Sequence, residues 1–305
     1  MPRDIDHLVL AVRDLDAARS TYARMGFTLT PVARHPFGTK NSLVQLHGGF
    51  LELLAVDDPT LIAEPGEGRF SFAAFNRDYL REREGLSMLV LASADPAADR
   101  AAFVAGGLPV YEPFGFERIA KGPDGVERKV AFALTFTSDA RVGGAAGFFT
   151  CQNRFPENFW RAEFQRHDNG AEKIAAAVFV SRDPADFHIF FTIFSGQHDM
   201  TATSLGVTFD LGRSQLDLLS PPAFRAFFGE DAGPDPRRFT AYRVAVRDLA
   251  ATRARFVANA VPFTELSGAL VVPSSYACGA AVAFVPGADD GPETSASGGS
   301  PRSDL

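Results

Sequence analysis

The sequence predicts an α+β protein built from four β-α-β-β-β units, which pair into two domains with curved mixed sheets and outer helices. Three observations predict this fold: a strand-to-helix motif that occurs near both ends of the chain, two weaker copies between them, and extended segments after every predicted helix. An internal repeat of this kind sets the architecture.

The motif first occupies residues 7–19 and returns at residues 241–253, with the stretch Ala-Val-Arg-Asp-Leu intact in both copies. Each copy begins with an apolar run short enough for a strand and continues, after Asp14 or Asp248, with helical spacing of apolar residues. An aspartate at this point can accept hydrogen bonds from the first amides of a helix. Each copy therefore predicts a strand followed by a capped helix.

The two weaker copies cover residues 88–95 and 176–183, and each ends in an aspartate that is followed by proline. Proline is favoured at the first helical position, where its missing N–H costs nothing. Helices are therefore expected up to residue 105 and over residues 187–194. Three further strands complete each unit, at residues 27–33, 41–47 and 50–56; 114–120, 128–137 and 146–152; 201–204, 206–210 and 215–219; 263–266, 269–272 and 280–285.

Residues 154–172 interrupt the repeat and predict a boundary between domains at residues 1–165 and 173–286. Residues 287–305 are rich in Gly, Ser, Pro, Asp and Thr, with almost nothing to bury, and predict a disordered tail.

Composition excludes several classes of protein. The net charge is −7 and the basic residues are scattered, which argues against a nucleic-acid partner. No apolar run approaches the roughly 18 residues of a membrane span. The two cysteines, Cys151 and Cys278, have no paired spacing, so a reducing cytoplasm fits. A homodimer is an assembly that the sequence allows.

The first unit also carries a family resemblance. His7-Leu-Val-Leu-Ala-Val-Arg-Asp-Leu15, with Glu52 near the end of the unit, resembles the vicinal-oxygen-chelate superfamily of glyoxalases, extradiol dioxygenases and bleomycin-resistance-type binding proteins. Within it, the chain is similar to a bacterial glyoxalase-like group through His35-Pro-Phe-Gly-Thr-Lys-Asn41, Phe50-Leu-Glu-Leu-Leu54 and Gln165-Arg-His-Asp-Asn-Gly-Ala171.

The resemblance implies that paired units curl into a cup, where side chains from first and last strands hold a divalent metal ion. His7 and Glu52 match these positions. The other units depart from the pattern, because Met88, Ala176 and Ala241 stand where the first unit has His7. A metal site in the C-terminal half is therefore not expected, although Asp217 parallels Glu52.

Strand alternation gives an independent argument for the same pair. It places His7 on a face with Val9 and Ala11, and Glu52 on a face with Phe50 and Leu54. A carboxylate in apolar surroundings is costly unless it is paired, bound to a metal or open to a solvated cavity. The plainer alternative is that the two side chains hydrogen-bond each other or end their strands at the rim.

His167 is the expected third ligand, since its segment can fold back over the cup, and Gln152 is a weaker candidate. The set would suit Fe, Mn, Ni or Zn with open positions for substrate. Glu52 would then be both ligand and catalytic base. The alternative for His167 is a linker histidine that packs or caps.

His35, Thr39 and Asn41 are the expected substrate contacts, because short polar groups follow a tight turn at Gly38 just before a strand. An ordinary Pro-Gly turn is the alternative. The sequence thus leads to a metal-dependent lyase, isomerase or dioxygenase that acts on a small molecule with vicinal oxygens. The competing hypothesis is a non-catalytic protein that binds or sequesters a small molecule in the same cup.

Overall fold

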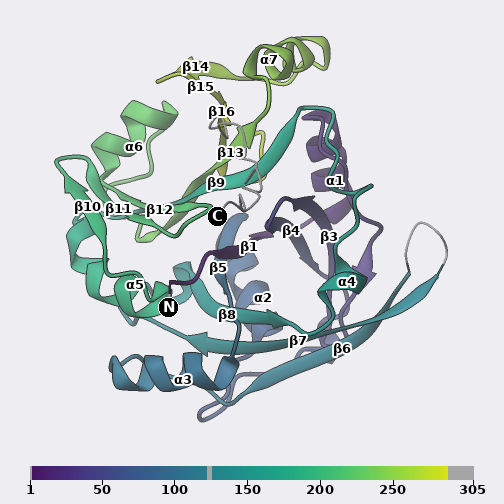
Figure 1. Ribbon diagram of the computed structural model, residues 1–305, viewed down its shortest axis with the longest axis vertical. Helices are drawn as coiled ribbons and strands as arrows, with labels where there is room; N and C mark the ends of the chain where they lie inside the picture. Colours follow the sequence, from purple (N-terminus) through teal and green to yellow (C-terminus); the bar gives the residue numbers. More distant parts are fainter. Residues whose placement is uncertain (1, 122–125, 288–305) are drawn as a thin grey trace, which may run out of the picture.

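The computed structural model describes residues 2–121 and 126–287. Its strands form two eight-stranded sheets, which lie side by side (Figure 1). The first sheet contains β1 (Ile5–Ala11), β2 (Ala33–Arg34), β3 (Thr39–Leu46), β4 (Gly49–Val56), β5 (Gly85–Ala92), β6 (Phe114–Lys121), β7 (Glu127–Thr137) and β8 (Gly147–Asn153). The second contains β9 (Ala171–Val180), β10 (Met200–Thr203), β11 (Gly206–Asp210), β12 (Gln215–Leu219), β13 (Arg238–Val246), β14 (Thr264–Leu266), β15 (Ala269–Val272) and β16 (Ala281–Pro286).

The strand orders show the predicted repeat directly. They are β2-β3-β4-β1-β5-β8-β7-β6 and β10-β11-β12-β9-β13-β16-β15-β14, so each strand of the first sheet has a counterpart at the same place in the second. Within a unit the first and last strands are parallel, as in β1 with β4 and β9 with β12. Paired units meet through antiparallel first strands, β1 with β5 and β9 with β13. The predicted α+β fold with two curved mixed sheets is confirmed.

α-Helices lie between the strands in chain order. They are α1 (Leu15–Arg24), α2 (Phe72–Glu82), α3 (Pro96–Ala105), α4 (Pro156–Phe159), α5 (His188–Ser195), α6 (Pro221–Phe228) and α7 (Leu249–Ala258). Among the described residues, none of the helices has the length and apolarity needed to cross a membrane.

The predicted aspartate caps are present at three of the four repeats. Asp14 accepts from the amides of Asp16 and Ala17, and Asp95 and Asp248 cap α3 and α7 in the same way. Asp183 makes no such bond, because the chain first forms a short 3-10 turn over Pro184–Phe187. The expected cap is wrong there, and α5 begins later.

Several elements differ from the sequence prediction. The strand expected at residues 27–33 is reduced to β2, because Pro31 has no N–H to donate and only Thr30 reaches β3, through its bond to Leu43. Helices α2 and α6 were not predicted. Each follows the last strand of a unit and begins at a serine, Ser71 or Ser220, whose hydroxyl accepts from an amide in the first turn.

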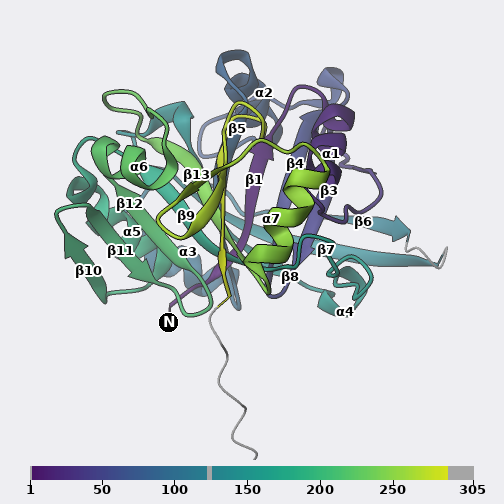
Figure 2. The same ribbon diagram turned by 90° about the horizontal axis from the view of Figure 1, so that it is seen from above.

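The two halves of the chain share one hydrophobic core. Its fully buried members include Leu8 and Phe148 from the first sheet and Val244 and Phe284 from the second. Figure 2 shows α7 next to α1, where the Asn259 side chain donates to the carbonyl of Arg24. All first-sheet strands fall within residues 5–153 and the second sheet begins at Ala171. Of the predicted tail, residues 288–305 lie outside the described residues.

Candidate active site

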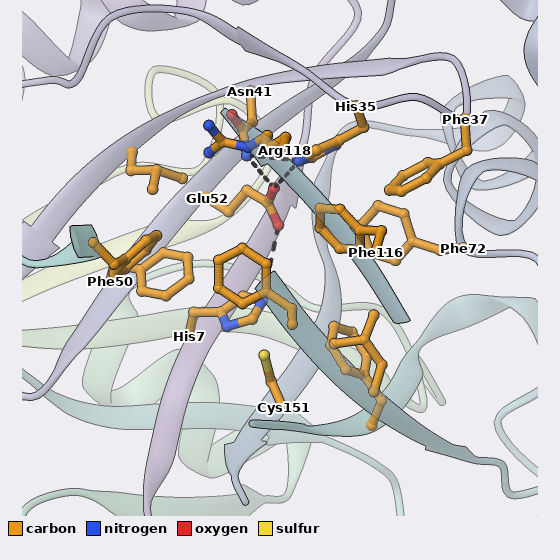
Figure 3. Close-up of a pocket in the computed structure, with 15 residues that line it drawn as sticks. His7, His35, Phe37, Asn41, Phe50, Glu52, Phe72, Phe116, Arg118 and Cys151 are labelled. Atoms are coloured by element: carbon orange, nitrogen blue, oxygen red, sulfur yellow. Dashed lines mark hydrogen bonds and ion pairs between the residues drawn. The ribbon is translucent and has the colours of Figure 1, made fainter. Parts of the chain in front are cut away.

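A cavity of about 490 Å³ lies within the first sheet, and it contains both His7 and Glu52 (Figure 3). This figure includes space that is open to solvent. Most of its wall is apolar, and a few polar groups converge at one side. The lining residues are His7, His35, Phe37, Asn41, Leu43, Phe50, Glu52, Phe72, Phe116, Arg118, Phe132, Leu134, Phe149, Cys151 and Phe159.

Parallel pairing of β1 with β4 brings His7 and Glu52 together. The register sets Val9 opposite Glu52 and His7 opposite Phe50, and alternation then directs both polar side chains to one face. Each residue is only 5% exposed. His7 Nε2 lies 3.8 Å from Glu52 Oε2, and both side chains line the one cavity.

The orientation of the His7 ring is fixed on both sides. Its Nδ1 lies 2.5 Å from a carboxylate oxygen of Asp6, and its face stacks on Phe50 with ring centroids 4.3 Å apart. When Nδ1–H donates to Asp6, the lone pair of Nε2 faces Glu52. A carboxylate that orients an imidazole in this way is typical of histidines that bind metal ions or accept protons.

The Glu52 carboxylate lies between the rings of His7 and His35 in Figure 3. Burial raises the pKa of Glu52, while His7, a hydrogen bond from Asn41 and the charge of Arg118 oppose the rise. Asn41 Nδ2 donates to Glu52 Oε1 over 2.6 Å. This buried carboxyl therefore holds its proton to a higher pH than an exposed glutamate does.

His35 is held as a neutral imidazole. Burial, together with the nearby positive charge of Arg118, lowers the pKa of His35 to about 3. Its Nδ1 is hydrogen-bonded to the Thr39 hydroxyl at 2.8 Å, and Asn41 Nδ2 lies 3.2 Å from its Nε2. The neutral ring thus donates from Nδ1 and accepts at Nε2.

Of the three expected substrate contacts, His35 and Asn41 line the cavity. Thr39 is fully buried and does not; its hydroxyl bonds to His35. The predicted turn therefore supplies two residues of the cavity wall and one that positions His35. Whether either wall residue contacts substrate stays a prediction.

His167 does not line this cavity. The prediction that it is the third metal ligand is therefore wrong. The Thr28 amide donates to its Nδ1 over 3.0 Å, and its Nε2 lies 2.7 Å from the carbonyl oxygen of Gln45. Both ring nitrogens are therefore used by backbone groups, and no lone pair is left for a metal ion. His167 instead attaches the segment after β8 to the first sheet.

At the positions equivalent to His7 and Glu52, the described part of the second unit supplies no ligand pair. Its strands pair Met88 with Gly147 and Val90 with Phe149, so Met88 and Phe149 occupy the places of His7 and Glu52. Gln152 donates to the carbonyl of Ala94 and does not line the cavity. Cys151 does line it, but burial raises the pKa of the thiol well above its usual range. The thiol is therefore neutral and a poor nucleophile.

Arg118 is a residue of the cavity wall that the sequence reasoning missed. It lies on β6, and its buried Nε has no hydrogen-bond partner. Burial lowers the pKa of its guanidinium, and the charge of Glu52 opposes this. A signal was present, because alternation along Phe114, Phe116 and Arg118 places all three on one face.

The equivalent region of the second sheet is filled by the protein itself. Phe224 and Phe228 of α6 pack with Ala241 and Val271 in a separate buried cluster. Asp217, the counterpart of Glu52, forms an ion pair with Arg243 and accepts a hydrogen bond from Thr208. Its charge is thus already compensated by the protein.

A divalent ion fits between His7 and Glu52. Metal bonds of about 2.0 to 2.2 Å reach both atoms across 3.8 Å, and one imidazole with one carboxylate suits several divalent ions. Within residues 2–121 and 126–287, no group of three or more His, Cys, Asp or Glu side chains is arranged to hold a metal ion. Further ligands would have to be water or substrate oxygens.

A family model described as a glyoxalase-like domain matches residues 5–191. The chain belongs to this glyoxalase-like family. The match contains His7, Glu52 and the whole cavity, and it places the chain in the vicinal-oxygen-chelate superfamily. No curated protein matches the sequence.

Solved structures confirm the fold of this glyoxalase-like protein at low sequence identity. A hypothetical protein from Staphylococcus aureus has a TM-score of 0.67 at 14% identity, covering 92% of this chain and 98% of the other. A mutant 4-hydroxymandelate synthase from Streptomyces coelicolor has 0.55 at 11%, covering 93% and 91%. The Mn(II)-bound glyoxalase from Novosphingobium aromaticivorans has 0.52 at 14%, covering 93% and 82%.

Proposed function

We propose that this protein is a metal-dependent enzyme of the lyase, isomerase or dioxygenase type, acting on a small molecule with vicinal oxygens. The observation that carries the proposal is the 3.8 Å approach of His7 Nε2 to Glu52 Oε2 inside a mostly apolar cavity. The Mn(II)-bound glyoxalase, which shares the fold, supports a divalent ion, here Fe, Mn, Ni or Zn.

When bound, a divalent ion would supply charge stabilisation for oxygens of the substrate. His7 and Glu52 would hold it, with Asp6 keeping the lone pair of His7 directed inward. Glu52 is also suited to proton transfer, because burial raises the pKa of its carboxyl and so makes it a stronger base than an exposed glutamate. The phenylalanine walls make the same space largely apolar.

A second candidate is a non-catalytic protein that binds or sequesters a small molecule. The observation in its favour is that Met88 and Phe149 replace a second ligand pair, which leaves two protein ligands in the cavity. The proposal also places the protein in the cytoplasm, supported by two free cysteines, and leaves a homodimer open.

Thermal melts with added metal separate the two candidates. An ion that binds only the folded state stabilises it by about 2.7 kcal/mol at a free concentration 100 times its Kd. For protein first treated with chelator, we expect Mn(II), Fe(II), Ni(II) or Zn(II) to raise the melting temperature of the wild type and not of His7→Ala.

His47→Ala is the matched control, because His47 is an exposed histidine at the turn between β3 and β4. Its response to metal should equal that of the wild type. Equal responses of the wild type and His7→Ala would defeat the metalloenzyme proposal and favour the binding protein.

A further inference from the structure

A second pocket, with about 1150 Å³ of empty volume, opens directly beside the catalytic cavity. The two share Asn41, Leu43, Arg118 and Phe159, so these residues form the junction between them. The outer pocket is lined by the segment around β2, by β6 and β7, and by residues near α4. A ligand that occupied both spaces would pass Arg118.

The outer pocket is basic in a protein that is acidic overall. Arg34, Arg118, Arg128 and Arg161 line it, and no Asp or Glu does, although the chain has a net charge of −7. Arg34 pairs with Asp57 and Arg161 with Glu163, so these two charges are partly compensated. Positive charge gathered in a concave surface attracts anionic ligands.

Arg118 differs from Arg34 and Arg161 in having no ion-pair partner within the described residues. Its Nε is buried without a hydrogen-bond partner, and Asn41 Oδ1 is in the same condition although Asn41 is 96% buried, being 4% exposed. Both amide hydrogens of Asn41 already go to Glu52 and His35. Buried polar groups are nearly always satisfied, so the open Arg118 N–H indicates a ligand group that accepts from it, whereas Asn41 Oδ1 needs a donor such as water or a ligand hydroxyl.

The inner cavity has the opposite character. Seven of its fifteen lining residues are phenylalanines. Such a wall suits an aromatic or branched apolar group, which it would desolvate, and it offers no second cation to an anion. The outer pocket thus carries the positive charges, and the inner cavity, which adjoins it, has the apolar wall.

We propose that the ligand is a small anion with an apolar body, whose carboxylate or phosphate binds Arg118 at the junction while the apolar body lies in the phenylalanine-lined cavity. The anionic group accepts from the open Nε of Arg118, and the outer arginines add long-range attraction. This inference rests on the proposed function for the idea that the cavity is catalytic, but the binding geometry stands without a metal ion.

The single tryptophan provides the signal for a test. The Trp160 ring lies 5.1 Å from Phe159 and 6.0 Å from Phe50, measured between centroids, and both of these residues line the cavity. Fluorescence titrations in the presence of EDTA would use 3-phenylpropionate, 2-phenylethyl phosphate and the neutral 3-phenylpropanamide. We expect one of the two anions to bind about tenfold or more tightly than the amide, because charge-assisted bonds are roughly twice as strong as neutral ones.

Arg118→Gln should remove this preference for the anion, and Arg118→Lys, which keeps the charge, should recover part of it. The control is Arg253→Gln, an exposed arginine that pairs with Glu265 far from both pockets, and it should keep the full preference. The anion that binds more tightly identifies the group as carboxylate or phosphate.

The inference would be overturned if the wild type bound 3-phenylpropanamide as tightly as it binds both anions. This comparison uses only the wild type, so it does not depend on the folding of a variant. An unchanged preference in Arg118→Gln would overturn it too. Because EDTA is present throughout, failure of the metal proposal leaves the result intact, and failure here leaves the metal test intact.

Discussion

At the residue scale, Glu52 is the buried carboxyl of the cavity. It is a buried carboxyl with one hydrogen-bond donor, Asn41, and two imidazoles close to its oxygens. Burial raises its pKa, so the folded state favours the protonated form. For such a group, the stability contribution is complete below the unfolded pKa, about 4.3 for Glu, and is lost as the pH rises through the folded pKa.

Glu52→Gln should therefore stabilise the metal-free protein at neutral and alkaline pH. The amide keeps an oxygen for Asn41 and removes the cost of a buried charge, so we expect a gain of about 1 to 3 kcal/mol at pH 8 that shrinks to nothing near pH 4. Denaturant unfolding in EDTA at several pH values measures this difference. Glu67→Gln, at an exposed position, should show no such trend, and a pH-independent difference for Glu52→Gln would contradict the assignment.

Residue identities near the site were easier to predict from sequence than the partners of each atom. Alternation and the family resemblance were enough to select His7, Glu52, His35 and Asn41. They could not show that Thr28 and Gln45 use both nitrogens of His167, because those contacts form only when distant segments fold together. Such contacts follow from tertiary packing and carry no local signal.

At the scale of elements, the same strand arrangement serves two purposes. The first sheet has a cavity over the face that carries His7 and Glu52. At the equivalent face of the second sheet, Phe224 and Phe228 of α6 fill the space. Arg243 also lies over the rings of Phe227 and Phe228 while it pairs with Asp217. We infer that the second half contributes stability and the first half contributes the site.

Asp217→Asn should accordingly destabilise the protein, by about 3 kcal/mol, because it leaves Arg243 without its partner in a largely buried place. The double variant Asp217→Leu with Arg243→Met should recover most of the loss, since apolar residues of similar volume can replace a buried pair. Denaturant unfolding measures both. A single variant that costs nothing, or a double variant that costs more than the single, would show that the pair is not structurally important.

Most strands could be predicted from the sequence because the same unit occurs four times. Helices α2 and α6 and the course of β6 could not be predicted. Neither helix belongs to the repeated motif. β6 lies at one edge of its sheet, six places from β3, and only the curvature of the whole sheet brings Arg118 to the cavity that β1 and β4 line. Sheet curvature depends on the packing of all eight strands and cannot be predicted from the sequence of one segment.

At the scale of the whole molecule, the two halves are joined by a continuous core and by buried polar contacts. The hydroxyls of Tyr22 and Tyr242 lie 3.0 Å apart at the boundary, and burial raises the pKa of both well above the usual range of tyrosine. The phenols are therefore neutral and can hydrogen-bond to each other. Tyr22 lies on α1 and Tyr242 on β13, so this contact joins an element of the first half to one of the second.

The central claim is that His7 and Glu52 together bind one divalent ion in the cavity of the first sheet. Anomalous diffraction from crystals soaked in Mn(II) tests it most directly. We predict one strong peak about 2.0 to 2.2 Å from both His7 Nε2 and Glu52 Oε2, and its loss in crystals of His7→Ala. A cavity with no peak in the wild type, or a peak that remains in His7→Ala, would contradict the claim.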